Sequence, residues 1–119
     1  MKLEDFYAAL GGDLEGTMER ICRRRLVERF VLRFLSDESF PALEKALSEG
    51  NYEEAFRAAH SLKGTASNIG FTRLFEASDA LTEALRGGER PQDEEILMFH
   101  VREEYERTMA LLRKFQCMD

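Results

Sequence analysis

Glycine and proline divide this sequence into helix-length segments, and this punctuation constrains the fold more than any other feature. Between the breaks the chain is rich in Leu, Ala, Glu and Arg, which favour helices, and no alternating strand pattern of useful length occurs. We expect short helices at about 3–10 and 13–22, and longer rods at 24–49, 51–69, 71–87 and 92–117. The first rod is broken near Pro41, where Ser39 is the expected N-cap, and Pro91 is expected to open the last rod.

The loops between these rods are only a few residues long, so consecutive rods must lie antiparallel. Their apolar residues recur at spacings of three and four, which gives each rod one apolar stripe. We therefore predict an all-α protein, an antiparallel up-down four-helix bundle over 24–117 with a helical segment at 1–22. The 119 residues form a single domain in this interpretation.

Charge and cysteine content exclude several classes of protein. The net charge of −6 argues against a general nucleic-acid binder, and no apolar run is long enough to span a membrane. The N-terminus is acidic and lacks an apolar signal core, so we expect a cytoplasmic protein. Cys22 and Cys117 lack metal-ligand spacing and are expected to be free thiols, and no metal site is expected. The basic run Arg23 to Arg25, with Arg20, indicates a solvated helix face or, as the alternative, a surface for an anionic partner.

The rod at 51–69 has an unusual polar face. Its small and apolar residues cluster on one side: Ala55, Ala58, Ala59, Leu62, Ala66 and Ile69. His60 points almost opposite to them. Lys63, Gly64 and Ser67 follow it on the same face, and Arg57 lies one turn before it. We therefore expect an exposed histidine with a cation beside it.

Gly64 is the odd residue of this face, because a glycine inside a helix costs about 1 kcal/mol relative to alanine. A side chain at this position is expected to crowd the His60 imidazole, so glycine clears space for a phosphoryl group or another protein. A neutral imidazole can act as a nucleophile, and the Lys63 ammonium can stabilise a phosphoryl group. The other histidine, His100, is expected to lie on the surface of the last rod.

The contiguous segment Ala58 to Gly70, with Ala-His-Ser-Leu-Lys-Gly at its centre, resembles the signature of the histidine-containing phosphotransfer (HPt) domain family. The resemblance covers roughly residues 13–117. It implies a four-helix bundle that accepts a phosphoryl group from an aspartate of a receiver domain and returns it. It also implies that His60 is the phosphoacceptor, Lys63 the phosphoryl-contacting cation and Gly64 the steric clearance.

One position departs from the family pattern. Many members place a Glu or Gln on the next helix to hold the other imidazole nitrogen, and by motif spacing this position is Thr82. Asp79, one turn earlier, is the alternative. Phe56, one turn before His60, lies at the edge of the polar face and is a candidate for partner docking.

Two functions remain open. The first is a stand-alone phosphorelay carrier, not an enzyme, that has no nucleotide site or cofactor of its own. The resemblance implies a response-regulator receiver domain as its partner, with Mg²⁺ on that receiver, and a hybrid histidine kinase is a further candidate partner. The second is a bundle adaptor that binds a receiver and transfers nothing. In both cases we expect a monomer that binds neither nucleic acid nor membrane.

Overall fold

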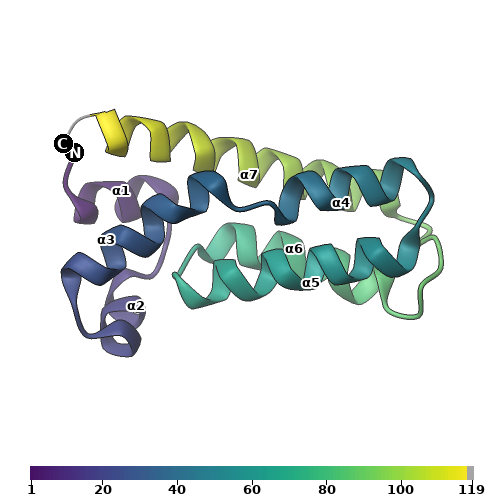
Figure 1. Ribbon diagram of the computed structural model, residues 1–119, viewed down its shortest axis with the longest axis horizontal. Coiled ribbons are helices and arrows are strands. Elements are labelled where there is room, and N and C mark those ends of the chain that lie inside the picture. Colours follow the sequence, from purple (N-terminus) through teal and green to yellow (C-terminus); the bar gives the residue numbers. More distant parts are fainter. Residues whose placement is uncertain (118–119) are drawn as a thin grey trace.

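The computed structural model describes residues 1–117, and all of the regular structure within them is helical (Figure 1). The elements are α1 (Leu3–Leu10), α2 (Leu14–Ile21), α3 (Arg24–Arg33), the 3₁₀ turn η1 (Phe34–Ser36), α4 (Ser39–Ser48), α5 (Tyr52–Asn68), α6 (Thr72–Leu85) and α7 (Glu94–Cys117). The predicted all-α class is confirmed.

Helices α4 to α7 form the bundle, and α1 to α3 gather at one end of it (Figure 1). Helix α5 packs between α4 and α6, and α6 packs on α7. Helix α7 is the longest and extends beyond the bundle, where α1 and α3 pack against it. The predicted first rod is thus divided between two parts of the molecule. Its second half, α4, belongs to the bundle, and its first half, α3, belongs to the N-terminal end.

Two helix starts differ from the sequence prediction. The Asp37 carboxylate accepts a hydrogen bond from the backbone N–H of Ser39 at 2.9 Å, so Ser39 is the first residue of α4 and not its N-cap. Pro41 lies in the first turn, as expected. The last helix begins at Glu94, because residues 91–93 form a turn in which the Glu94 N–H donates to the Pro91 carbonyl.

Aromatic rings join the N-terminal helices to the bundle. The Phe6 ring of α1 lies 5.8 Å from the Phe71 ring and 5.4 Å from the Phe115 ring, measured between centroids. Phe34 packs edge-on against Phe71 at 5.5 Å. All four rings are buried. Phe30 and Phe75, which a helical pattern also assigns to the core, are only half-buried.

The N-terminal segment also closes the end of α5, where backbone carbonyls have no partner within the helix. The Tyr7 hydroxyl donates to the Ile69 carbonyl at 2.6 Å, and the Asp13 N–H donates to the Gly70 carbonyl at 2.8 Å. The Arg20 guanidinium donates to the carbonyls of Ser67 and Asn68. Burial raises the pKa of Tyr7 to about 12, so its hydroxyl stays protonated and able to donate.

This closure depends on Gly70, which has a φ of 71°. A Cβ at this position would lie 2.2 Å from the Thr17 hydroxyl and 2.4 Å from the Asp13 carbonyl oxygen. Glycine is therefore required both for the left-handed conformation and for the close approach of α2.

We predict that Gly70→Ala lowers the free energy of unfolding by roughly 3 kcal/mol, because strain in the backbone and the clash with α2 add. Gly50→Ala is the matched control, since Gly50 has a φ of 69° and open space around it. The control should lose about 1 kcal/mol. Urea unfolding followed by circular dichroism measures both. Equal losses would show that the contact with α2 contributes nothing.

Candidate functional site

Helix α5 carries the candidate site, and both of its ends are fixed. The Asn51 side chain accepts a hydrogen bond from the Glu54 N–H, which caps the first turn as the sequence predicts. Ala55, Ala59, Leu62 and Ala66 are fully buried, and Ile69 is 2% exposed. His60, on the opposite side, is exposed. The helical phase predicted from the sequence is therefore confirmed.

The His60 ring lies beside an aromatic ring that is held by a cation. The rings of Phe56 and His60 are stacked, with centroids 6.0 Å apart and planes at 21°. The Arg86 guanidinium lies over the Phe56 ring, 5.4 Å from its centroid. Glu83 holds that guanidinium through two hydrogen bonds, of 2.9 and 3.0 Å. Phe56 is half-buried, in agreement with the partial exposure expected for a docking residue.

This arrangement perturbs the charged pair at the end of α6. The Arg86 guanidinium, by hydrogen bonding and by its charge, lowers the pKa of the Glu83 carboxyl, and the Lys63 charge contributes in the same direction. The Glu83 carboxylate in turn raises the pKa of Arg86, by hydrogen bonding and by its charge. Both side chains remain ionised at neutral pH, so the guanidinium stays in place over Phe56.

Lys63 is engaged and not free. Its ammonium lies 2.9 Å from the Asp79 carboxylate, and its side chain is only 23% exposed. Asp79 on α6 therefore partners the cation of the site, and its role as an orienter of the His60 ring is not supported. The ammonium is held on the α6 side of the histidine, about one turn along the helix.

Thr82 does not orient the imidazole either. Its side chain is fully buried, and its hydroxyl donates to the Ser78 carbonyl at 2.6 Å. The helical phase of α6 turns this position into the bundle, so the structure does not support Thr82, the position given by motif spacing, as a residue that orients His60. Within residues 1–117, the His60 ring makes no hydrogen bond to another side chain or to the backbone.

Gly64 faces open space. A Cβ at this position would meet no atom within 4 Å, so a small side chain would not crowd the His60 ring as expected. The space that glycine leaves is therefore outside the protein, where a partner can enter. Because glycine has no side chain, no atoms project from the helix beside the histidine at this position.

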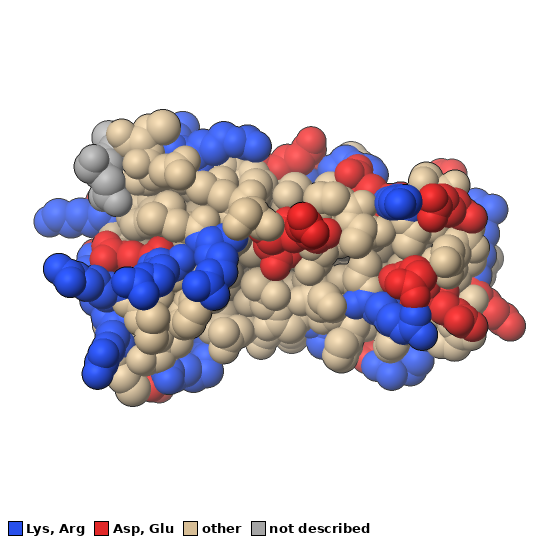
Figure 2. All heavy atoms as spheres, in the orientation of Figure 1, with Lys and Arg blue, Asp and Glu red and all other residues tan. Residues whose placement is uncertain are grey.

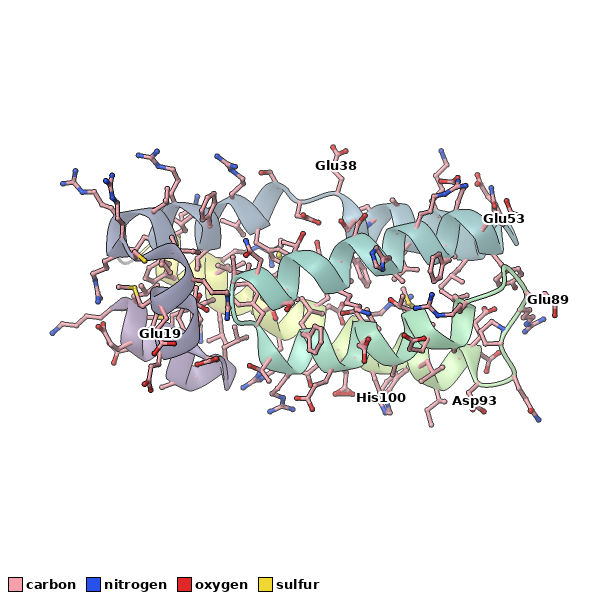
Figure 3. The ribbon with its side chains drawn as sticks, turned by 90° about the horizontal axis from the view of Figure 1, so that it is seen from below. Glu19, Glu38, Glu53, Glu89, Asp93 and His100 are labelled. Atoms are coloured by element: carbon pink, nitrogen blue, oxygen red, sulfur yellow. The ribbon has the colours of Figure 1, made fainter. Side chains whose placement is uncertain are left out.

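The two outer candidates lie on either side of this surface. Ser67 is exposed and lines a hollow of about 180 Å³ together with Phe75 of α6. Arg57 forms an ion pair with Glu54 and lines a hollow of about 330 Å³ between α4 and α5. His100 is exposed on α7 and lines a hollow on the α6–α7 side of the bundle (Figure 3). It therefore takes no part in the α5 surface.

The sequence did not single out Arg86 and Glu83. Their spacing of three residues near the end of a helix indicates an ion pair. The contact between Arg86 and Phe56, however, depends on how α6 packs on α5, which no local pattern shows.

Other kinds of site find no support in the part of the chain that the structure describes. No group of three or more His, Cys, Asp or Glu side chains is arranged to hold a metal ion within residues 1–117. None of the helices described is long and apolar enough to cross a membrane.

The fold and the site together define a helical bundle that presents an exposed histidine on the outer face of one helix. A scan against protein-family models matches residues 31–111 to the Hpt domain. This match covers more than half of the chain, and the chain therefore belongs to the Hpt domain family. Members of this family carry phosphoryl groups on histidine in two-component signalling. Comparisons with curated proteins and with solved structures found no match.

We predict that Arg86→Gln raises the pKa of the Glu83 carboxyl toward its usual range, because the mutation removes the main cause of the lowered value. Carboxyl-detected NMR titration measures this pKa. Arg90→Gln is the control, because Arg90 pairs with Glu94 and not with Glu83. The His60 and Phe56 ring signals should shift in the first variant only, and unchanged ring signals would contradict the stacked arrangement.

Proposed function

We propose that this protein is a stand-alone phosphocarrier that shuttles a phosphoryl group between His60 and the aspartate of a receiver domain. The observation that carries the proposal is the exposed His60 ring, with Lys63 and Gly64 one turn further along the same helix, inside the Hpt segment. The partner would be a response regulator, and a hybrid histidine kinase would be a further source of phosphoryl groups. We expect a monomer that acts in the cytoplasm.

The transfer needs one nucleophile from this chain. A ring nitrogen of neutral His60 attacks the phosphorus atom of the receiver's aspartyl phosphate, and the bond from phosphorus to the carboxylate oxygen breaks. The carboxylate leaves with the electron pair, and the proton on the other ring nitrogen remains or passes to water. The return step reverses these changes. The Mg²⁺ that neutralises the phosphoryl oxygens belongs to the receiver, and no nucleotide enters the reaction.

The surroundings of His60 suit a partner that arrives from outside. The Phe56 ring lies nearly parallel to the imidazole on the same face of α5. Gly64 leaves room for the receiver's aspartate to approach. The Lys63 ammonium can move from Asp79 to the transferred phosphoryl group, whose charge exceeds that of one carboxylate. Arg86 over Phe56 adds a second fixed positive charge at the edge of the docking surface.

A non-transferring adaptor is the second candidate. One observation favours it, namely that no hydrogen bond from residues 1–117 orients the imidazole. Positioning by hydrogen bonds fixes the tautomer in many catalytic histidines. An adaptor, however, has no need for a helix-interior glycine beside an exposed histidine.

We predict that His60→Gln folds and binds its receiver but accepts no phosphoryl group, because the variant keeps the docking surface and removes the nucleophile. The experiment incubates the protein with a panel of phosphorylated receiver domains and measures acid-labile phosphate. His100→Gln is the matched control and should accept phosphate normally. Equal incorporation in wild type and His60→Gln would disprove the assignment, and no incorporation in wild type with any receiver would favour the adaptor.

We predict that Lys63→Ala slows transfer about tenfold to a hundredfold without abolishing it, since a charge-assisted contact is worth roughly 1–3 kcal/mol. Asp79→Asn is the control, because it breaks the same ion pair but keeps the ammonium. The control should transfer at least as fast as wild type in rapid-quench assays. Equal slowing in both variants would show that transfer depends on the ion pair between Lys63 and Asp79 and not on the Lys63 charge itself.

We predict that Gly64→Ala transfers within a few-fold of wild type, because the methyl group meets no atom of the protein. Gly64→Gln should keep the fold but transfer much more slowly, since its side chain occupies the space that the receiver enters. Rapid-quench rates with one receiver, and thermal melts of each variant, separate the two effects. If Gly64→Gln transferred the phosphoryl group at the wild-type rate, the space beside Gly64 would have no role in transfer.

A further inference from the structure

An arginine surface on α3 takes no part in the site described above. Arg25, Arg29 and Arg33 follow one another at spacings of four, so they lie along one face of the helix, and all three are exposed. We call these residues, with Phe30, the arginine ridge. Space-filling atoms of Lys and Arg gather over this end of the molecule in Figure 2.

The ridge is not balanced by carboxylates. Arg24, its neighbour, binds Glu4 with two hydrogen bonds of 2.6 Å. Arg25, Arg29 and Arg33 make no ion pair within the described residues, whereas arginines on α5, α6 and α7 do. Residues 20–33 hold six arginines and one glutamate in a chain whose net charge is −6.

This arrangement opposes the stability of α3. Like charges four residues apart repel each other on a helix. The first turn of α3 contains no acidic residue, and Arg23, Arg24 and Arg25 stand at the positive end of the helix dipole. Only Arg33, in the last turn, has a favourable position. A sequence that opposes local stability without a gain in packing is typical of a functional surface.

The ridge also has the composition of a binding surface. The Arg33 guanidinium lies over the half-buried Phe30 ring, 5.5 Å from its centroid. Arginine and aromatic residues are enriched in protein interfaces, and a guanidinium forms paired hydrogen bonds with a carboxylate. We propose that the arginine ridge of α3 is a docking surface for an acidic segment of a partner protein.

Charge and length favour a protein segment over a polyanion or a membrane. The ridge runs from Arg25 to Arg33, nine residues with a rise of about 12 Å, which is enough for two turns of a helix but few phosphates. The remainder of the chain is strongly acidic and would be repelled by DNA or by an anionic bilayer.

The ridge is separate from the phosphotransfer surface. Helix α3 packs on α2 and α7, while His60 lies on α5 between α4 and α6. Arg25 and Arg29 also precede the segment 31–111 that matches the Hpt domain. The ridge is thus available for a second partner, whether or not a receiver occupies the histidine.

The test uses the full chain and a fluorescent 18-residue helical peptide of Glu and Leu, with a Lys and Leu peptide for comparison. We expect the acidic peptide to bind, and the triple variant Arg25→Gln, Arg29→Gln, Arg33→Gln to bind it at least about tenfold more weakly. The matched control carries Lys45→Gln, Arg113→Gln and Lys114→Gln, which changes the net charge equally on exposed residues off the ridge. It should bind within about twofold of wild type.

Several results would overturn the proposal. These are no binding of the acidic peptide, equal weakening in the ridge and control variants, or tighter ridge-dependent binding to a 20-base-pair DNA duplex or to vesicles of phosphatidylcholine and phosphatidylserine. Circular dichroism of the ridge variant should show an unchanged fold with a melting temperature no lower than that of wild type. A marked loss of stability would show that the arginines have a structural role.

Discussion

The burial of small and apolar residues along one side of α5 determines where the other residues of the site lie. Ala55, Ala59, Leu62 and Ala66 are fully buried, so the helix can turn in only one way about its axis. His60 stands opposite this stripe and must face outward. Alanine also lets α4 and α6 approach α5 closely, and this approach brings the α6 residues Asp79 and Arg86 to the edge of the histidine surface. The site is a consequence of how α5 packs.

The N-terminal helices support α5 from its far end. They supply the partners for its last carbonyls, and Phe6 of α1 lies in the same aromatic cluster as Phe71, which follows α5. Leu3 and Phe6 are fully buried although they precede the segment that matches the Hpt domain. The core of this protein therefore extends beyond the family segment. In addition, α3 is separated from α4 and lies at the N-terminal end of the molecule. Its residues Arg25, Arg29 and Arg33 are exposed there.

Much of the fold could be predicted from local signals. Helical spacing of apolar residues, Asn51 as an N-cap and Gly70 at a helix end are properties of short stretches of sequence, and the structure confirms each of them. The exposure of His60 follows from the same phase argument. Contacts between helices could not be predicted in this way. The pairing of Lys63 with Asp79, the burial of Thr82 and the position of Arg86 over Phe56 all depend on the rotation of α6 against α5.

We propose above that the exposed His60 imidazole, which lies beside the Phe56 ring, is the group that accepts the phosphoryl group. Nitrogen NMR of histidine-labelled protein, recorded with a phosphorylated receiver, tests it most directly. We predict coupling between phosphorus and one ring nitrogen of His60, with the His100 signals unchanged. Coupling at His100, or unchanged His60 signals with every receiver, would contradict the account.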